Sequence, residues 1–189
     1  MSTTAPLVQD LSYLAQTPAH KDGIAQTVAV GSPSHPSLIE VIRRPGAFTS
    51  GAFSLVSLPP GALFARITTA TPAPAKAYTS VQISPTEHVE LNSDLVYCNH
   101  SCEPTVVFDM SQMAVRVVPD RPLKIGDPLT FFYPSTEWNM AQPFTCTCGT
   151  VACKGWIQGA ERMPQEVLDA YWLNPHIEAL LAAREKSNR

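Results

Sequence analysis

The sequence predicts a mostly β domain made of several small sheets, followed by a short C-terminal helical segment. Eighteen prolines and nine glycines divide the 189 residues into short stretches, so long elements are not expected. The stretches between these residues are apolar or alternate between apolar and polar residues, as is typical of strands. Apolar residues at helical spacing are sustained only after Pro164.

Each expected strand is a run of four to six residues or so, bounded by turn-forming residues. The expected strands are residues 37–42, 53–58, 63–67, 78–83, 88–91, 105–109, 114–118 and 129–133. Residues 84–86 and 110–113 would close two hairpins, and residues 68–76 form a loop rich in Thr, Ala and Pro. The turn at Pro59-Pro60-Gly61 ends the second strand, and Pro134 ends the last.

Residues 160–189 are expected to hold two short helices. Pro164 can open the first, in which Val167, Leu168 and Tyr171 share a face. Asn174 and Pro175 read as the cap and first residue of the second, where Arg184 and Lys186 suit the helix dipole. The favoured interpretation is a packing appendage, and the alternative is a lid or a partner-binding helix. At the other end we expect residues 1–36 to be loosely ordered, apart from a helical turn around Leu11–Ala15.

Composition limits the classes of function. An apolar fraction of 44% supports one core, while 15% charged residues and a net charge of −3 argue against a general nucleic-acid footprint. No apolar run approaches the roughly 20 residues of a membrane span, so no membrane partner is expected. The start of the chain lacks the basic segment of a secretory signal, which favours a reducing intracellular compartment, nuclear or cytoplasmic.

The most informative feature is a cluster of cysteines. Cys146, Cys148 and Cys153 lie within eight residues, one ligand short of a closed tetrahedral zinc site, and Cys102 or Cys98 can supply the fourth thiolate. Cysteines also occur as small buried apolar residues or in disulfides. An odd count of five in a reducing compartment favours a zinc site instead.

Four segments together resemble the SET-domain protein lysine methyltransferases. Asn99-His100-Ser101-Cys102 resembles the family's Asn-His-Ser-Cys signature, and residues 123–133 resemble its second, Gly-Glu-Glu-Leu-Thr-Tyr-Asp-Tyr type of segment. Residues 51–61 are similar to the family's opening strand and Pro-x-Gly turn, and the cysteine cluster with Gly155 and Trp156 is similar to the post-SET zinc motif. The segments occur in the family's order and span about residues 37 to 158.

The resemblance implies a β-clip-like SET fold of several small sheets, with a pseudoknot formed by the C-terminal segment. It implies a SET domain at residues 37–134 with an insert at about 76–92, a post-SET segment at 143–158 and C-terminal helices at 160–189. It also implies S-adenosyl-L-methionine as methyl donor and a structural zinc. The implied zinc ligands are Cys102, Cys146, Cys148 and Cys153, which leaves Cys98 as the spare.

Site roles follow from the same resemblance. Tyr133 matches the family's catalytic tyrosine, and Phe131 with Tyr133 would line the channel for the substrate lysine. The residues that match cofactor-binding positions are Gly51, Phe53, Tyr97, Asn99, His100 and Trp156. The sequence departs from the family pattern at Thr49, Val96, Thr105 and Phe132, where the family carries Gly, Arg, Asn and Asp.

The expected partner is a protein or peptide that bears a lysine, for example a histone tail. We expect a lysine N-methyltransferase that acts on a histone or non-histone protein. The alternative is a catalytically weak or inactive SET-like zinc protein that acts as a binding module. Tyr133, Asn99 and His100 favour the first reading, whereas Thr49 and Val96 favour the second.

Overall fold

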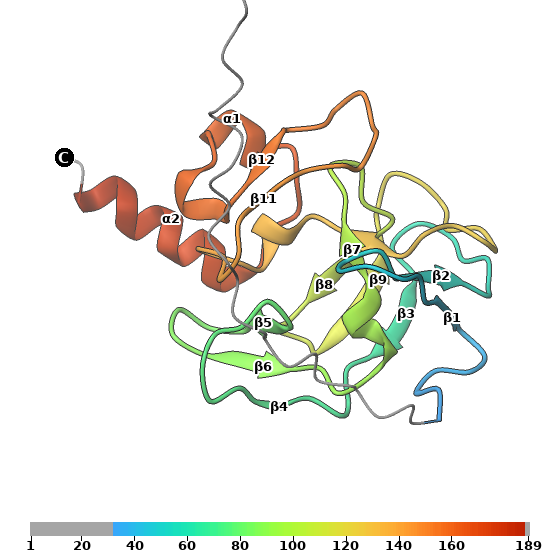
Figure 1. Ribbon diagram of the computed structural model, residues 1–189. Helices are drawn as coiled ribbons and strands as arrows, with labels where there is room; N and C mark the ends of the chain where they lie inside the picture. Colours follow the sequence, from blue (N-terminus) through green and yellow to red (C-terminus); the bar gives the residue numbers. More distant parts are fainter. Residues whose placement is uncertain (1–31, 188–189) are drawn as a thin grey trace, which may run out of the picture. The chain divides into compact units, whose positions relative to one another are not determined.

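The computed structural model describes residues 32–187, and the elements named below all belong to the unit that begins at Pro33 (Figure 1). The helical turn expected at Leu11–Ala15 and most of the segment 1–36 lie outside the described residues. At the start of the described chain, the backbone N–H of Ser34 donates to Asp94 Oδ2 over 2.7 Å. This contact joins the first described residues to the 3-10 helix η2 (Asp94–Tyr97).

Small β-sheets dominate the described chain, as the sequence predicts. The strands are β1 (Ile39–Ile42), β2 (Gly51–Ser54), β3 (Leu63–Arg66), β4 (Thr71–Pro72), β5 (Ser80–Gln82), β6 (His88–Glu90), β7 (Asn99–His100), β8 (Val106–Asp109), β9 (Ala114–Val117), β10 (Thr130–Phe131), β11 (Phe144–Thr145) and β12 (Trp156–Ile157). In the described residues they form three pairs, β1–β2, β7–β10 and β11–β12, and two three-stranded sheets ordered β3-β9-β8 and β4-β6-β5. The mostly β fold class is confirmed.

The two predicted hairpins form, since β5 pairs with β6 and β8 pairs with β9, both antiparallel. The strand expected at 53–58 is shifted: β2 begins at Gly51 and ends at Ser54. Its end has a local cause, because Ser54 Oγ donates to the carbonyl of Val56 and accepts from the Val56 N–H. A side chain that bonds its own backbone in this way competes with the sheet ladder. The loop expected at 68–76 contains the two-residue strand β4.

The segment that holds the Asn-His signature and the segment that holds Tyr133 lie side by side. β7 and β10 pair in parallel, with Thr130 opposite Asn99 and Phe131 opposite His100. Thr105 ties the same two segments together, since its Oγ1 donates to the carbonyl of Pro128 over 2.7 Å and accepts from the N–H of Thr130 over 3.0 Å. The pairing therefore brings the two signature segments, which are about thirty residues apart in the sequence, next to each other.

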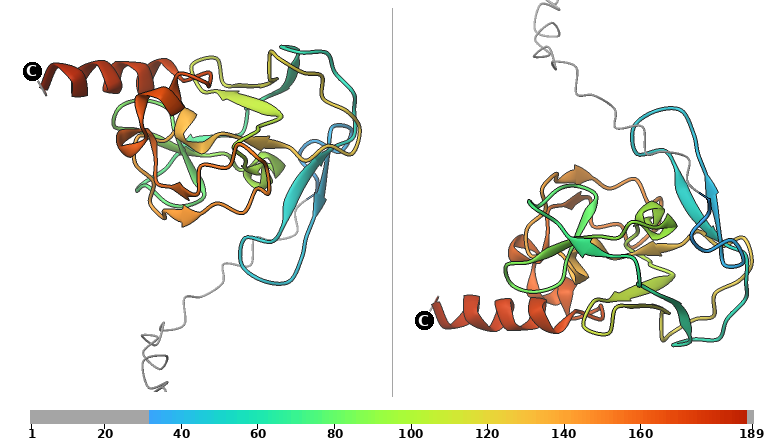
Figure 2. Two further views of the ribbon diagram at one scale, coloured as in Figure 1. Left: turned by 90° about the horizontal axis from the view of Figure 1, so that it is seen from above. Right: turned by 90° about the horizontal axis from the view of Figure 1, so that it is seen from below.

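The C-terminal segment is an integral part of the unit. Its helices are α1 (Gln165–Leu168) and α2 (Pro175–Ser187), preceded by the 3-10 helix η4 (Ala160–Arg162). Leu168 and Ile177 are fully buried in a second hydrophobic cluster that also contains Cys102, Phe132 and Ile157. In both views of Figure 2, α2 and the β1–β2 pair lie on opposite sides of the unit. The burial of Leu168 and Ile177 in this cluster agrees with the interpretation of the C-terminal residues as a packing appendage.

Two residues explain how this segment attaches. Tyr171 stacks on Phe132, with ring centroids 3.7 Å apart and ring planes at 8° to each other. An aspartate, which the family pattern carries at position 132, could not make this stacking contact. Pro175 opens α2 as expected, but the fully buried side chain of Asn174 bonds elsewhere. Its Oδ1 accepts from the N–H of Met110, and its Nδ2 donates to the carbonyls of Phe108 and Ser135. Among the described residues, no helix has both the length and the apolar character needed to cross a membrane.

Candidate functional site

A cavity of about 630 Å³ lies where the two signature segments meet. Its inner wall is formed by buried residues of the main core, among them Leu91, Leu95, Cys98 and Phe131. Residues 140–148 form another part of the lining and include two of the clustered cysteines, Cys146 and Cys148. The cavity therefore connects the region around Tyr133 with the cysteine cluster.

Tyr133 lines this cavity at the start of the 3-10 helix η3 (Tyr133–Ser135). Its hydroxyl donates to the carbonyl of Cys98 at 3.3 Å, which is long for an O–H···O hydrogen bond. Burial is the main reason why the pKa of Tyr133 is raised well above its usual value. The phenol is therefore neutral at physiological pH, and its weakly held hydroxyl can act as a hydrogen-bond donor or acceptor inside the cavity.

Phe131 also lines the cavity, and its ring packs against two aromatic neighbours. It stacks on Phe108 with centroids 4.2 Å apart and lies 4.7 Å from the ring of Tyr133. Its side chain is buried, and the residue offers no polar atom to the cavity. The wall beside Tyr133 is consequently apolar and rigid.

His100 links Tyr133 to the cysteine cluster. Burial lowers the pKa of its imidazole to about 4, so the ring is neutral at physiological pH. Its Nδ1 accepts a hydrogen bond from the backbone N–H of Tyr133 over 3.2 Å, so the proton of the neutral ring is on Nε2. Nε2 lies 3.4 Å from Cys102 Sγ and donates toward that sulfur. One buried ring thus holds the backbone of Tyr133 and a thiol of the cluster at the same time.

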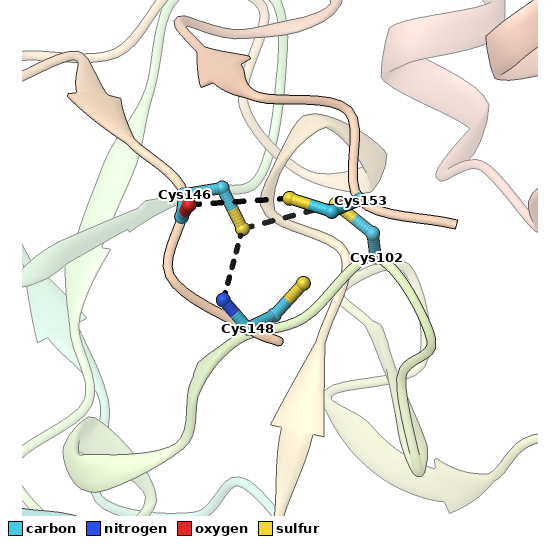
Figure 3. A group of neighbouring side chains, drawn as sticks. All are labelled: Cys102, Cys146, Cys148 and Cys153. Atoms are coloured by element: carbon cyan, nitrogen blue, oxygen red, sulfur yellow. Dashed lines mark hydrogen bonds between the residues drawn. The ribbon is translucent and has the colours of Figure 1, made fainter. Parts of the chain in front are cut away.

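The four cysteines named by the sequence come together from two distant parts of the chain (Figure 3). The Sγ atoms of Cys102, Cys146, Cys148 and Cys153 all lie within 4.8 Å of one another, and those of Cys102 and Cys146 are 3.9 Å apart. A tetrahedral zinc with Zn–S bonds of about 2.3 Å requires sulfurs about 3.8 Å apart. The backbone N–H groups of Lys154 and Cys148 point at the sulfurs of Cys102 and Cys146 over 3.3 and 3.4 Å, as expected for groups that stabilise thiolates. This cluster could hold a metal ion.

The electrostatics of the cluster also fit a cation. Burial raises the pKa of Cys102 and of Cys146. For Cys148, burial is outweighed by hydrogen bonds from Thr150 and the neighbouring cysteines, and its pKa is lowered to about 6. Thiols this close cannot all ionise unless a cation lies among them. All five cysteines lie in the described part of the chain and are free thiols, and Cys98 lies outside the cluster.

The other residues named by the sequence as cofactor-binding divide into two groups. Asn99 and His100 line the cavity, whereas Gly51, Phe53, Tyr97 and Trp156 do not. The reasons are local. A Cβ at Gly51 would lie 3.2 Å from Asn99 Nδ2, so this glycine gives room to the Asn99 side chain, which donates to the carbonyl of Ser50.

The three aromatic residues of that group have other contacts. The guanidinium of Arg43 lies 5.3 Å from the ring centre of Tyr97, and that of Arg44 lies 6.0 Å from the ring centre of Phe53. Trp156 is 52% exposed, and its Nε1 donates to Gln158 Oε1. None of these three rings forms part of the cavity lining in the described chain.

Many lining residues were not foreseen from the sequence, among them two aromatic residues and one acidic residue. Phe48 and Tyr78 come from two separate loops, are each 68% exposed, and meet edge to face with centroids 5.5 Å apart. Phe48 also has a positive φ of 60°, which is unusual for an aromatic residue. Glu137 is buried and also lines the cavity. Its sequence signal is that it is the sole acidic residue between Asp127 and Glu161.

The positions that depart from the family pattern also have defined places. Thr49 and Val96 both line the cavity. The hydroxyl of Thr49 lies within hydrogen-bond distance of the carbonyls of Arg44, Pro45 and Gly46, so it closes the loop that carries Phe48. A threonine at this position therefore has a structural use that a glycine could not serve.

Comparison with known proteins gives the family. The methyltransferase flvH of Aspergillus flavus is 59% identical over 153 residues, which cover 81% of this chain and 86% of the relative. No family model matches the chain. At this identity and coverage, the chain belongs to the same methyltransferase family as flvH.

Proposed function

We propose that this methyltransferase is an S-adenosylmethionine-dependent protein-lysine N-methyltransferase of the SET type, with one structural zinc. The observation that carries the proposal is the convergence of Tyr133, Asn99 and His100 on one cavity that the cysteine cluster adjoins. The four resembling segments and the methyltransferase relative support the same reading.

The cavity lining offers both apolar and polar groups to the proposed methyl donor. When bound, S-adenosylmethionine supplies a methyl group carried on a positively charged sulfonium. Asn99, His100 and the loop residues Phe48 and Thr49 are the lining residues that would hold it. Phe48 offers a flat apolar face, and Asn99 offers polar atoms on an exposed side chain.

Tyr133 and Cys98 have the properties needed to orient an amine. A lysine amine must lose its proton before it can attack a methyl group, and an apolar cavity favours the neutral form. The Tyr133 hydroxyl and the Cys98 carbonyl already lie 3.3 Å apart, so an amine that enters the cavity beside them would find two oxygen acceptors. With little covalent work required of the protein, such positioning is the main contribution to the rate.

Zinc would act as a structural element. The four thiolates form a closed ligand set with no free position for a substrate. The ion would join the segment 146–153 to Cys102, and through His100 it would fix the backbone of Tyr133. Metal loss is therefore expected to lower activity through disorder of the cavity wall.

The experiment uses labelled S-adenosylmethionine with the purified protein and two protein pools, core histones and a whole-cell protein extract. Acid hydrolysis followed by amino-acid analysis identifies the labelled residue. We expect label in methylated lysine and none in the heat-inactivated control. Label confined to small molecules, or to residues other than lysine, would contradict the protein-lysine assignment.

A further inference from the structure

Glu137 contributes a negative charge to the cavity that the proposed function has not yet used. Its side chain is 10% exposed, and it lines the cavity that Tyr133 and Phe131 also line. Among the described residues that form this lining, it is the sole Asp or Glu, and no Lys or Arg accompanies it. Apart from the cysteine thiols, the cavity therefore has one fully charged group.

The carboxylate is held in place from one side. Its Oε1 accepts from the backbone N–H of Gln82 over 2.9 Å and from Thr136 Oγ1 over 3.2 Å. The backbone N–H of Glu137 donates to the carbonyl of Tyr133 over 3.0 Å, which keeps Glu137 one turn beyond the tyrosine. The position of the charge relative to Tyr133 is thus fixed by both backbone and side chain.

The second oxygen has no hydrogen bond within residues 32–187. Oε2 lies 3.6 Å from Nε2 of His88, which is within ion-pair distance when that imidazole is protonated, and this buried nitrogen has no hydrogen-bond partner in the described chain. A buried carboxylate normally requires a cation or several donors to offset its lost hydration. Oε1 has the Gln82 N–H and the Thr136 hydroxyl, which lies equally close to the carbonyl of Tyr133, while Oε2 faces His88 without a hydrogen bond.

An ion pair with a protonated His88 is one structural use of the charge, whereas the hydrogen bond to Gln82 does not require a charge. The N–H of Gln82 needs a hydrogen-bond acceptor, and the amide oxygen of a glutamine at position 137 would serve equally well. Gln82 is also held independently, because its Oε1 accepts from the Trp138 N–H and its Nε2 donates to the carbonyl of Ser84. What a glutamate adds over a glutamine is the negative charge itself.

We propose that Glu137 selects a positively charged group, an organic ammonium or sulfonium, in the cavity beside Tyr133. This inference rests on the proposed function, in which both the acceptor lysine and the methyl donor bring a positive charge to the site. The aromatic rings of Phe131, Tyr133 and Phe144 line the same cavity, and their faces are favourable surfaces for a cation.

The expected effect is mainly on binding. A carboxylate near an ammonium favours the charged amine, so it helps capture and does not assist loss of the proton. Removal of the charge should therefore raise the KM for the acceptor more than it lowers kcat. We expect Glu137→Gln to weaken binding of the cationic ligand by about ten- to a hundredfold, as for loss of a buried charge-assisted hydrogen bond.

The test measures binding without turnover. The first arm titrates wild-type protein with n-butylammonium and with the neutral n-pentanol, observed by ligand NMR. The second arm compares, by calorimetry, the affinity for S-adenosylmethionine with that for uncharged-sulfur S-adenosylhomocysteine. Both arms are repeated with Glu137→Gln and with Glu178→Gln, a control at an exposed position of α2.

A preference for n-butylammonium that disappears in Glu137→Gln assigns the charge to the acceptor amine. If the affinity for S-adenosylmethionine relative to S-adenosylhomocysteine falls in Glu137→Gln, the charge of Glu137 is assigned to the sulfonium. The proposal is overturned if wild type shows no preference for the charged ligand in either arm, a result that does not depend on whether the variant folds. It is also overturned if a folded Glu137→Gln keeps every preference of the wild type. Because neither arm needs methyl transfer, absence of methyl-lysine product would count against the proposed function alone.

Discussion

Asn174→Ala should destabilise the protein by about 3 to 5 kcal/mol, because the side chain makes three buried hydrogen bonds between separate parts of the fold. The two bonds donated by Nδ2 are each expected to contribute about 1 kcal/mol. Loss of Oδ1 leaves the N–H of Met110, a residue 3% exposed, without its acceptor, at a further cost of about 1 to 3 kcal/mol. The backbone N–H of Asn174 still donates to the carbonyl of Ser135, which keeps the loss toward the lower value.

Urea unfolding of the metal-loaded protein, followed by circular dichroism at a fixed zinc concentration, measures this change. Asn139→Ala is the control at an exposed position: its side chain accepts a hydrogen bond from the exposed Lys76 Nζ, and the change in free energy of unfolding should be below about 1 kcal/mol. Asn174→Asp keeps an acceptor for Met110 but turns the second oxygen toward two carbonyls, so it should be no more stable than Asn174→Ala. A loss below about 1 kcal/mol for Asn174→Ala would refute the reasoning that this amide joins the C-terminal segment to the sheets.

Three further predictions test the metal, the product and the backbone. Cys148→Ser should lower the zinc content below one ion per chain in elemental analysis, whereas the control Cys98→Ala should not. Full retention of zinc in Cys148→Ser would exclude the proposed ligand set. Phe131→Tyr adds a hydroxyl to an apolar wall and should shift the product from di- or trimethyl-lysine toward monomethyl-lysine by about tenfold, seen by mass spectrometry over time. A wild type that stops at monomethyl-lysine would contradict this role for Phe131. Gly159→Ala would place a Cβ 2.5 Å from the Trp138 carbonyl oxygen, at a residue with a φ of 109°. Thermal unfolding should therefore show that the free energy of unfolding falls by about 3 kcal/mol or more. An unchanged unfolding midpoint would show that the backbone relaxes around the new methyl group.

The short strands and hairpins could be predicted because their signals are local. The turns at 84–86 and 110–113 are bounded by alternating residues, and the structure closes a hairpin at each. The second strand was misplaced because a side-chain bond of Ser54 to Val56 ends it early, and a strand propensity does not report such a bond. Spacing predicted the grouping of Cys146, Cys148 and Cys153 but left Cys98 and Cys102 open as the fourth member, and only the family resemblance named Cys102.

The lining of the cavity was predictable only in part, because it depends on contacts between distant residues. Glu137 enters the site through a bond to Gln82, which lies 55 positions earlier in the chain. Phe132 departs from the family pattern, and its stacking partner in the structure, Tyr171, lies 39 positions later in the chain. Trp156 was expected to form an aromatic wall of the cofactor site, but its side chain is exposed and does not line the cavity. Periodicity and composition do not report the exposure of a single side chain.

The most direct test of the proposed site compares Tyr133→Phe with wild type in methyl transfer and in S-adenosylmethionine binding. The lost hydrogen bond to the Cys98 carbonyl is long, so the fold should lose no more than about 1 kcal/mol. If the hydroxyl orients the amine in the transition state, kcat should fall about a hundredfold or more while the dissociation constant of S-adenosylmethionine stays within about twofold. Equal turnover of the two proteins would contradict the account, because Tyr133 would then be a packing residue of the cavity wall.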